Sequence, residues 1–92
     1  MGSKRSRADI YATVLEVIRK YPEGGRITRI SYGVGVPVDR LKTMVDSLYS
    51  YGLLTRSGDG NEVYYWVTPR GVEFLDTYWK MKGFLATFGE KS

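Results

Sequence analysis

The sequence contains no histidine and no cysteine, and these two absences exclude several kinds of site. The chain lacks the side chains that most often bind zinc, the thiols that form disulfides or act as nucleophiles, and the imidazole of a Ser/His/Asp triad. Its acidic residues are scattered among basic ones, so no pair of carboxylates indicates acid–base catalysis. We expect a protein that is not an enzyme and that uses no metal and no cofactor.

Long apolar runs are missing as well. No stretch approaches the ~20 apolar residues that span a bilayer, and the N-terminus has no apolar signal region, so we expect a cytoplasmic protein without a membrane partner. A length of 92 residues, 42% hydrophobic and 26% charged, suits one compact domain with a modest core. Function is therefore expected at a surface rather than in a deep pocket.

Positive charge is concentrated in the first part of the chain. Residues 1–56 hold ten Lys and Arg against five Asp and Glu, a net charge of +5, whereas residues 57–92 hold four against five, a net charge of −1. A surface with this excess attracts polyanions, of which nucleic acid is the commonest, although an ordinary solvated face has a similar composition. We expect the partner surface in the first half.

Hydrophobic spacing predicts a helix over residues 7–20, because apolar side chains recur there every three to four positions. Ser6 and Asp9 form a capping box at its start, and a proline with two glycines ends it. A short second helix is predicted over 26–32. A third begins with Pro37 in its first turn and ends before a glycine.

Two short strands are predicted over 53–56 and 62–67, with a glycine-rich hairpin tip between them. Thr68 and Pro69 then suit the N-cap and first turn of a last helix that runs to about residue 88. This order predicts a mainly α fold with a β-hairpin, in which a helix-turn-helix is followed by a wing and a long C-terminal helix.

Gly33 and Gly35 precede the third helix and raise the alternative of a nucleotide-binding loop. A dinucleotide fingerprint needs a preceding strand and a third glycine, where this chain has Val38, and a Walker loop needs a Lys-Ser/Thr pair that does not follow. We therefore expect the two glycines to turn the chain between two helices, one of them with a positive φ angle.

Residues 28–54, TRISYGVGVPVDRLKTMVDSLYSYGLL, resemble the helix-turn-helix of small archaeal winged-helix DNA-binding proteins of about ten kilodaltons. That family often shows a T-R-I-x-Y element, a helix of the form L-x-x-x-h-x-x-L and a G-L-[LI] opening to the wing. The matching residues here are Thr28, Arg29, Ile30 and Tyr32, then Leu41, Val45 and Leu48, then Gly52, Leu53 and Leu54.

A second segment, VTPRGVEFLDTYWKM, is similar to the family's [LV]-T-x-[KR]-G-x-x-F-L pattern through Val67, Thr68, Arg70, Gly71, Phe74 and Leu75. The resemblance covers residues 7–85. It implies double-stranded DNA binding by a homodimer whose C-terminal helices pair as an antiparallel coiled coil, as a transcriptional regulator or a nucleoid-associated chromatin protein. The chain departs from the family at Pro37, which replaces a Ser-type cap, and in its short final helix.

In a helix-turn-helix the second helix of the motif enters the major groove. The expected DNA contacts from this helix are Arg40, Lys42, Thr43 and Ser47, with Arg40 and Thr43 on one face as the base-contacting pair and Lys42 on phosphate. The further candidates are phosphate contacts: Arg26, Thr28, Arg29, Ser31 and Tyr32 near the short helix, Arg56 on the wing, and Lys4, Arg5 and Arg7 in the basic arm.

Two alternatives apply to these candidates. Arg40 could instead pair with Asp39 or Asp46 on a merely solvated surface. Among the aromatic residues, Tyr32, Tyr49 and Tyr51 are expected to pack within the protein rather than to stack on bases.

The last helix carries an apolar seam with spacings of 4, 3, 4 and 3, formed by Phe74, Tyr78, Met81, Leu85 and Phe88. A second stripe contains Val72, Leu75 and Trp79. We expect one stripe to pack on the winged domain and the seam to meet its copy in a homodimer, although the seam could also fold back onto its own chain. The expected division is a flexible basic arm (1–6), a winged domain (7–68), a dimerisation helix (69–88) and a tail (89–92).

A different class of function remains open, because winged helices also serve as protein-docking modules without DNA affinity. The fold alone does not distinguish DNA binding from protein docking.

Overall fold

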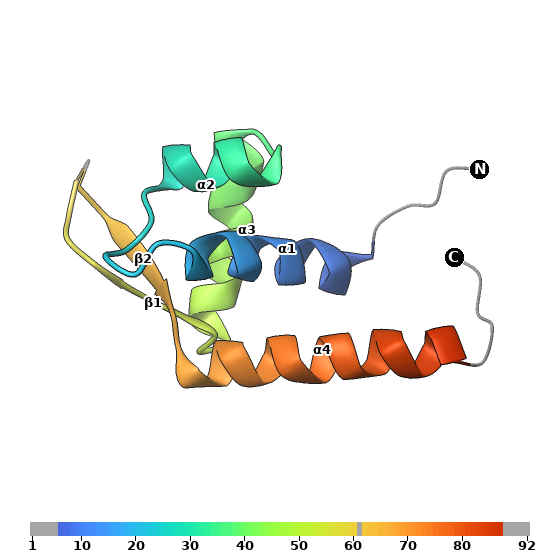
Figure 1. The fold of residues 1–92 in the computed structure, drawn as a ribbon. Helices are drawn as coiled ribbons and strands as arrows, with labels where there is room; N and C mark the ends of the chain where they lie inside the picture. The colour runs from blue at the N-terminus through green and yellow to red at the C-terminus, as the bar shows by residue number, and fades with distance from the viewer. Residues whose placement is uncertain (1–5, 61, 88–92) are drawn as a thin grey trace.

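The computed structural model describes residues 6–60 and 62–87, and within them the elements follow the predicted order (Figure 1). They are α1 (Arg7–Arg19), α2 (Ile27–Val34), α3 (Val38–Ser50), β1 (Leu54–Ser57), β2 (Tyr64–Val67) and α4 (Pro69–Thr87). The mainly α fold with a β-hairpin is therefore confirmed.

Most helix ends lie close to their predicted positions. The Ser6 hydroxyl accepts from the Asp9 N–H at 3.1 Å, and the Asp9 carboxylate accepts from the Ser6 N–H at 3.1 Å, which is the expected capping box. The prediction for Pro37 was wrong by one position: it is the N-cap of α3 with ψ 149°, and the helix begins at Val38.

The two glycines before α3 have different roles. Gly35 ends α2 in the left-handed region at φ 79°, as predicted for one of the pair. Gly33 lies inside α2, so its assignment to the turn was wrong. A Cβ atom there would lie 2.9 Å from the Val17 Cγ1 atom, so Gly33 allows α2 to approach α1 closely.

The core is formed around α1, which runs through the middle of the domain with α2 on one side of it and α4 on the other, while α3 passes behind it in this view (Figure 1). Each element contributes apolar side chains to one cluster. Its largest fully buried members are Val14, Leu15, Ile18, Ile30, Leu41, Val45, Leu48, Leu54 and Leu75.

The hairpin pairs β1 with β2 in antiparallel register, with Thr55 opposite Trp66. A connection not predicted from the sequence ties it to the loop after α1: Gly25 and Tyr65 exchange two backbone hydrogen bonds of 2.9 Å. The Trp66 indole N–H also donates to the Pro22 carbonyl at 3.1 Å. These contacts fix the wing against the body of the domain.

Helix α4 lies antiparallel to α1 (Figure 1). The Tyr78 hydroxyl donates to the Asp9 carboxylate, and the Lys82 ammonium lies 3.6 Å from the same group. The Trp79 indole N–H donates to Glu16 at 2.9 Å. Because Lys82 already lies beside the first turn of α1, the rest of α4 extends past the end of that helix.

The predicted seam of α4 is therefore not one free face. Tyr78 is only 8% exposed and is used within its own chain, which corrects its assignment to the seam. Phe74 and Leu85 are half-buried and Met81 is 48% exposed, while Phe88 lies outside the described residues. The second stripe is divided in the same way, because Leu75 is buried and Val72 is exposed.

Candidate nucleic-acid interface

Helix α3 buries one side and presents the other to solvent. Leu41, Val45 and Leu48 anchor it in the core with no exposed surface. At 100° per residue, the opposite side carries Asp39 and Thr43, both exposed. We call this exposed side, with Asp46 and Ser50, the α3 ridge.

One concave surface flanks the ridge on the side of α1. This α1–α3 groove, of about 510 Å³, is lined by Arg7, Ile10, Tyr11, Arg40, Thr43, Met44 and Ser47. It contains two guanidinium groups and no carboxylate. The spacing of Arg40 and Thr43 thus places both in one groove, and Ser47 lies with them.

A second concave surface flanks the ridge on the side of the wing. This wing groove, of about 530 Å³, is lined by Arg26, Ile27, Thr28, Lys42, Asp46, Arg56, Gly60, Val63 and Tyr65. Three cationic residues share it with one acidic residue. The α2 N-terminus also opens here, and its N-cap Arg26 makes no side-chain capping bond, so the positive end of the helix dipole adds to the field.

Arg40 and Lys42, neighbours in sequence on either side of Leu41, lie in opposite grooves. Their neighbouring positions in the sequence gave no sign of this separation. Cationic residues therefore stand on both flanks of the α3 ridge.

Arg56 connects the wing to α3. Its guanidinium carbon lies 4.1 Å from the centre of the Tyr49 ring. Its Nη1 atom lies 3.5 Å from an oxygen of the Asp46 carboxylate. Asp46 is thus engaged by Arg56, and among the described residues Arg40 forms no ion pair with either acidic residue of α3. The alternative of an Arg40 pair with Asp39 or Asp46 does not fit the structure.

The remaining candidates differ in whether their side chains are exposed, are used within the protein, or lie outside the described residues. Arg29 is exposed on α2, with its guanidinium 5.8 Å from the Tyr21 ring centre. The Ser31 hydroxyl donates to the Val36 carbonyl at 2.6 Å, so it stabilises the turn. Lys4 and Arg5 lie outside the described residues.

The tyrosines differ from expectation. Tyr32 is 93% exposed on α2, so the prediction that it packs within the protein was wrong. Tyr49 and Tyr51 are also exposed, but each has a partner: Tyr49 stacks with Arg56, and Tyr51 meets Tyr11 edge-on with ring centres 6.4 Å apart. Helical spacing carried the signal for this exposure, because at 100° per residue Tyr32 lies on the side of α2 opposite the buried Ile30.

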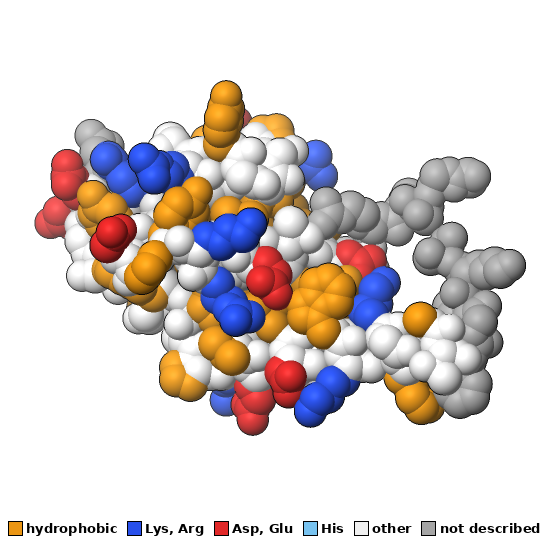
Figure 2. Space-filling model, viewed as in Figure 1, with side chains coloured by type: hydrophobic (Ala, Val, Ile, Leu, Met, Phe, Trp, Pro, Cys, Tyr) orange, Lys and Arg blue, Asp and Glu red, His pale blue; other side chains and the backbone are white. Residues whose placement is uncertain are grey.

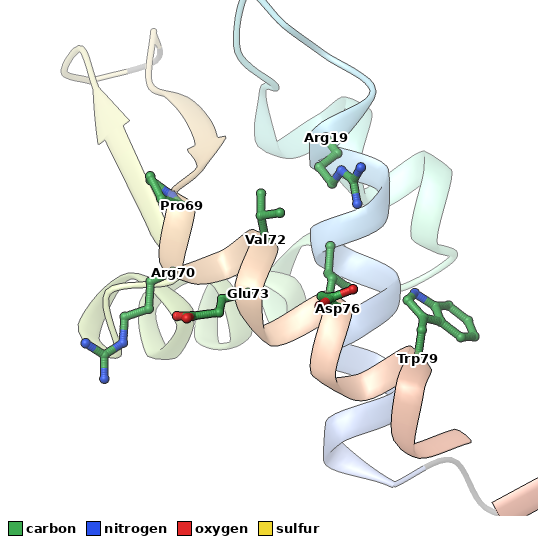
Figure 3. A pocket seen from close by; sticks show the side chains of 8 residues that line it. Arg19, Pro69, Arg70, Val72, Glu73, Asp76 and Trp79 are labelled. Carbon is green, nitrogen blue, oxygen red and sulfur yellow. The ribbon is translucent and has the colours of Figure 1, made fainter. Parts of the chain in front are cut away.

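A further groove, of about 690 Å³, lies between α1 and α4 (Figure 3). Arg19 and Arg70 line it together with Glu73 and Asp76, so charges of both signs meet there. This mixture does not favour a polyanion. Within residues 6–60 and 62–87 there is neither a group of acidic side chains arranged to hold a metal ion nor a helix long and apolar enough to cross a bilayer.

The family model described as winged helix-turn-helix matches residues 4–85, and the chain belongs to this family. Its fold is similar to that of Sso10a-2, a DNA-binding protein from Sulfolobus solfataricus. The TM-score is 0.72 at 21% identity, over 92% of this chain and 90% of that one. No curated protein sequence matches the chain.

Two other solved structures show how widely this fold is used. A MarR-family transcriptional regulator from Silicibacter pomeroyi has a TM-score of 0.69 at 22% identity, covering 91% of this chain and 68% of that one. Human N-acetylserotonin methyltransferase has a TM-score of 0.60 at 19% identity, covering 68% of this chain and 18% of that enzyme. Similarity at this level establishes the fold, and function has to be argued from the surface.

Proposed function

We propose that the chain binds double-stranded DNA through the α3 ridge and the two grooves beside it. The observation that carries the proposal is the placement of cationic residues on both flanks of one exposed helix, with Arg7 and Arg40 on one side and Arg26, Lys42 and Arg56 on the other. The description of Sso10a-2 as a DNA-binding protein supports it.

The dimensions of DNA suit this arrangement. An α-helix with its side chains is about 10–12 Å across, and the major groove of B-DNA is about 12 Å wide. With α3 in the major groove, the cations of its two flanks face the two phosphate backbones. The α2 N-terminus, which lines the wing groove, adds backbone N–H donors for a phosphate.

Within this interface we assign base contact to Arg40 and Thr43 and phosphate contact to Lys42, Arg26, Thr28 and Arg56. Arg40 suits the O6 and N7 acceptors of guanine, and the methyl group of Thr43 suits thymine. Arg7, Arg29 and Ser47 are proposed as further contacts, and so are Lys4 and Arg5, which lie outside the described residues.

We also propose that the protein acts as a homodimer joined through the last turns of α4. Met81 and Phe84 are 48% and 61% exposed, and apolar side chains stand on the end of this helix where it extends past the domain (Figure 2). Pairing of two such ends buries this apolar surface and presents two α3 ridges to one duplex. The expected cellular location is the nucleoid.

The test is the affinity for random duplex DNA measured by fluorescence anisotropy across a salt series. If Arg26 and Lys42 each neutralise a phosphate, their replacement by Ala weakens binding and lowers the slope of log K against log salt by about 1. Lys80→Ala is the matched control, because it removes the same charge from the exposed side of α4. Equal slopes in all three variants would contradict the proposal.

The same measurement, made on random and on enriched duplexes side by side, separates a chromatin protein from a regulator. Binding that is salt-dependent but indifferent to sequence indicates a chromatin protein, whereas a preferred sequence indicates a regulator. Folded protein that does not bind duplex DNA even at low salt supports a protein-docking module instead.

A further inference from the structure

We propose that Asp39 determines base specificity by accepting a hydrogen bond from the exocyclic amino group of a cytosine in the major groove. This inference rests on the proposed DNA binding and names the base that the α3 ridge selects.

The position of Asp39 favours contact with bases. It is the second residue of α3 and is exposed on the side opposite Leu41. In a helix-turn-helix, the N-terminal residues of the recognition helix are the ones that contact base edges. The ridge itself carries no cation, because Arg40 and Lys42 point into the two flanking grooves.

The negative charge of the Asp39 carboxylate is also not balanced by a neighbouring cation in the described part of the chain. The other acidic residue of α3, Asp46, lies 3.5 Å from Arg56, whereas Asp39 forms no ion pair or side-chain hydrogen bond among the described residues. A free carboxylate on a surface that approaches phosphates is repelled by them. This repulsion weakens binding to any duplex that does not offer a hydrogen-bond donor at that point.

The base edges in the major groove determine which base can donate a hydrogen bond to this carboxylate. Guanine and thymine present oxygen acceptors there, which repel a carboxylate. Adenine has an amino group, but its N7 acceptor lies next to it. Cytosine presents its N4 amino donor with no acceptor on its own major-groove edge, so it is the base that a carboxylate accepts from most favourably.

The competing explanation is structural, because an acidic residue in the first turn also stabilises a helix through its dipole. Asp39→Asn separates the two. The change keeps the shape and one acceptor oxygen but removes the charge and adds an amide donor, which suits the paired N6 and N7 atoms of adenine.

The experiment begins with wild-type protein and a library of random duplexes, from which bound sequences are recovered and sequenced. Beside the positions contacted by Arg40 and Thr43, we expect one further position to be fixed as a C·G pair. Substituting that pair is expected to weaken wild-type binding roughly tenfold or more. In Asp39→Asn this preference is lost or shifts to adenine, while binding to random duplex becomes tighter. Asp76→Asn, an exposed change on α4, is the control and retains the wild-type preference.

The outcomes distinguish this inference from the proposed function. If the wild type binds no duplex DNA, both fail. If it binds without base preference, or if Asp39→Asn retains the wild-type preference and changes only the melting temperature, DNA binding stands and the role of Asp39 in specificity is overturned.

Discussion

Among the acidic residues in the described part of the chain, Asp9 has the largest number of side-chain partners, namely Ser6, Tyr78 and Lys82. These partners lower the pKa of its carboxyl group. The Tyr78 hydroxyl is the main cause that lowers its pKa from 3.8 to about 2, followed by the Ser6 backbone N–H, while the Lys82 charge contributes less. One carboxylate thus caps α1 and attaches α4 to it. The same atoms stabilise a helix end and join two elements far apart in sequence.

This lowered pKa predicts how stability depends on acid. Because the folded protein holds Asp9 ionised more strongly than the unfolded chain does, its contribution is fully present above about pH 4 and is lost as the pH falls towards about 2. Tyr78→Phe removes the main cause. We expect the gap between wild type and Tyr78→Phe in urea midpoint to be largest near neutral pH and to shrink below pH 4. A gap of constant size from neutral pH to pH 2 would contradict this account.

At the scale of elements, the docking of α4 depends on close backbone approach at Gly71. A Cβ atom at Gly71 would lie 2.3 Å from the Leu53 carbonyl oxygen, which is backbone and cannot rotate away. Thr68 holds the same junction, accepting from the Gly71 N–H at 3.0 Å and donating to the Gly52 carbonyl at 2.7 Å. The start of α4 is thereby fixed against the turn before β1.

Gly71→Ala is expected to lower the free energy of unfolding by about 1–3 kcal/mol, because α4 must shift away from that turn. Gly83→Ala is the matched control in the same helix: apart from its chain neighbours and the backbone of its own helix, no atom of the described residues lies within 4 Å of its added Cβ, so helix propensity is expected to raise stability by roughly 0.4–1 kcal/mol. Chemical denaturation followed by circular dichroism measures both. Equal effects from the two variants would show that the Gly71 contact has no energetic role.

The wing also contacts α3 through Arg56. Its link to α3 through Arg56 uses an exposed stacking contact and an exposed ion pair, each worth about 1 kcal/mol or less. Arg56 therefore orients the wing beside α3 without contributing much to global stability. The backbone bridge at Gly25 provides the second attachment.

At the scale of the molecule, the proposed homodimer is joined through the apolar surface that remains on α4. Phe84→Glu places a charge on the proposed contact and is expected to give a monomer with the 10.5 kDa mass of one chain, where the wild type gives twice that mass. Val72→Glu is the control, because Val72 is 44% exposed in the first turn of α4, at the other end of the helix from Phe84. Sedimentation equilibrium measures the masses, and a wild type that remains monomeric at high concentration would remove the dimer from the proposal.

The proposed dimer would bring two copies of the α3 ridge and its grooves to one duplex. A single domain presents one α3 ridge, whereas two ridges related by a twofold axis contact successive turns of one duplex. Phe84→Glu therefore provides a way to separate binding by one domain from binding by the pair.

Much of the fold was determined by the sequence alone. The spacing of apolar residues, the capping box at Ser6, the left-handed Gly35 and the glycine-rich hairpin tip each act over a few neighbouring residues, so they predict elements and their order without any tertiary information. The excess of Lys and Arg over residues 1–56 likewise predicts the cationic character of α3 and its surroundings. The membership of the chain in the winged helix-turn-helix family agrees with that order of elements.

Only the tertiary structure decided how these parts meet. Arg26, Lys42 and Arg56 line one groove because α2, α3 and the wing pack together, and Tyr78 meets Asp9 across 69 positions of sequence. Helical spacing could not show which stripe of α4 was free, since Leu75 from one stripe and Tyr78 from the other both lie against the domain. Periodicity indicates that a side is apolar, but the packing of distant segments decides which apolar side is covered and which charges share a surface.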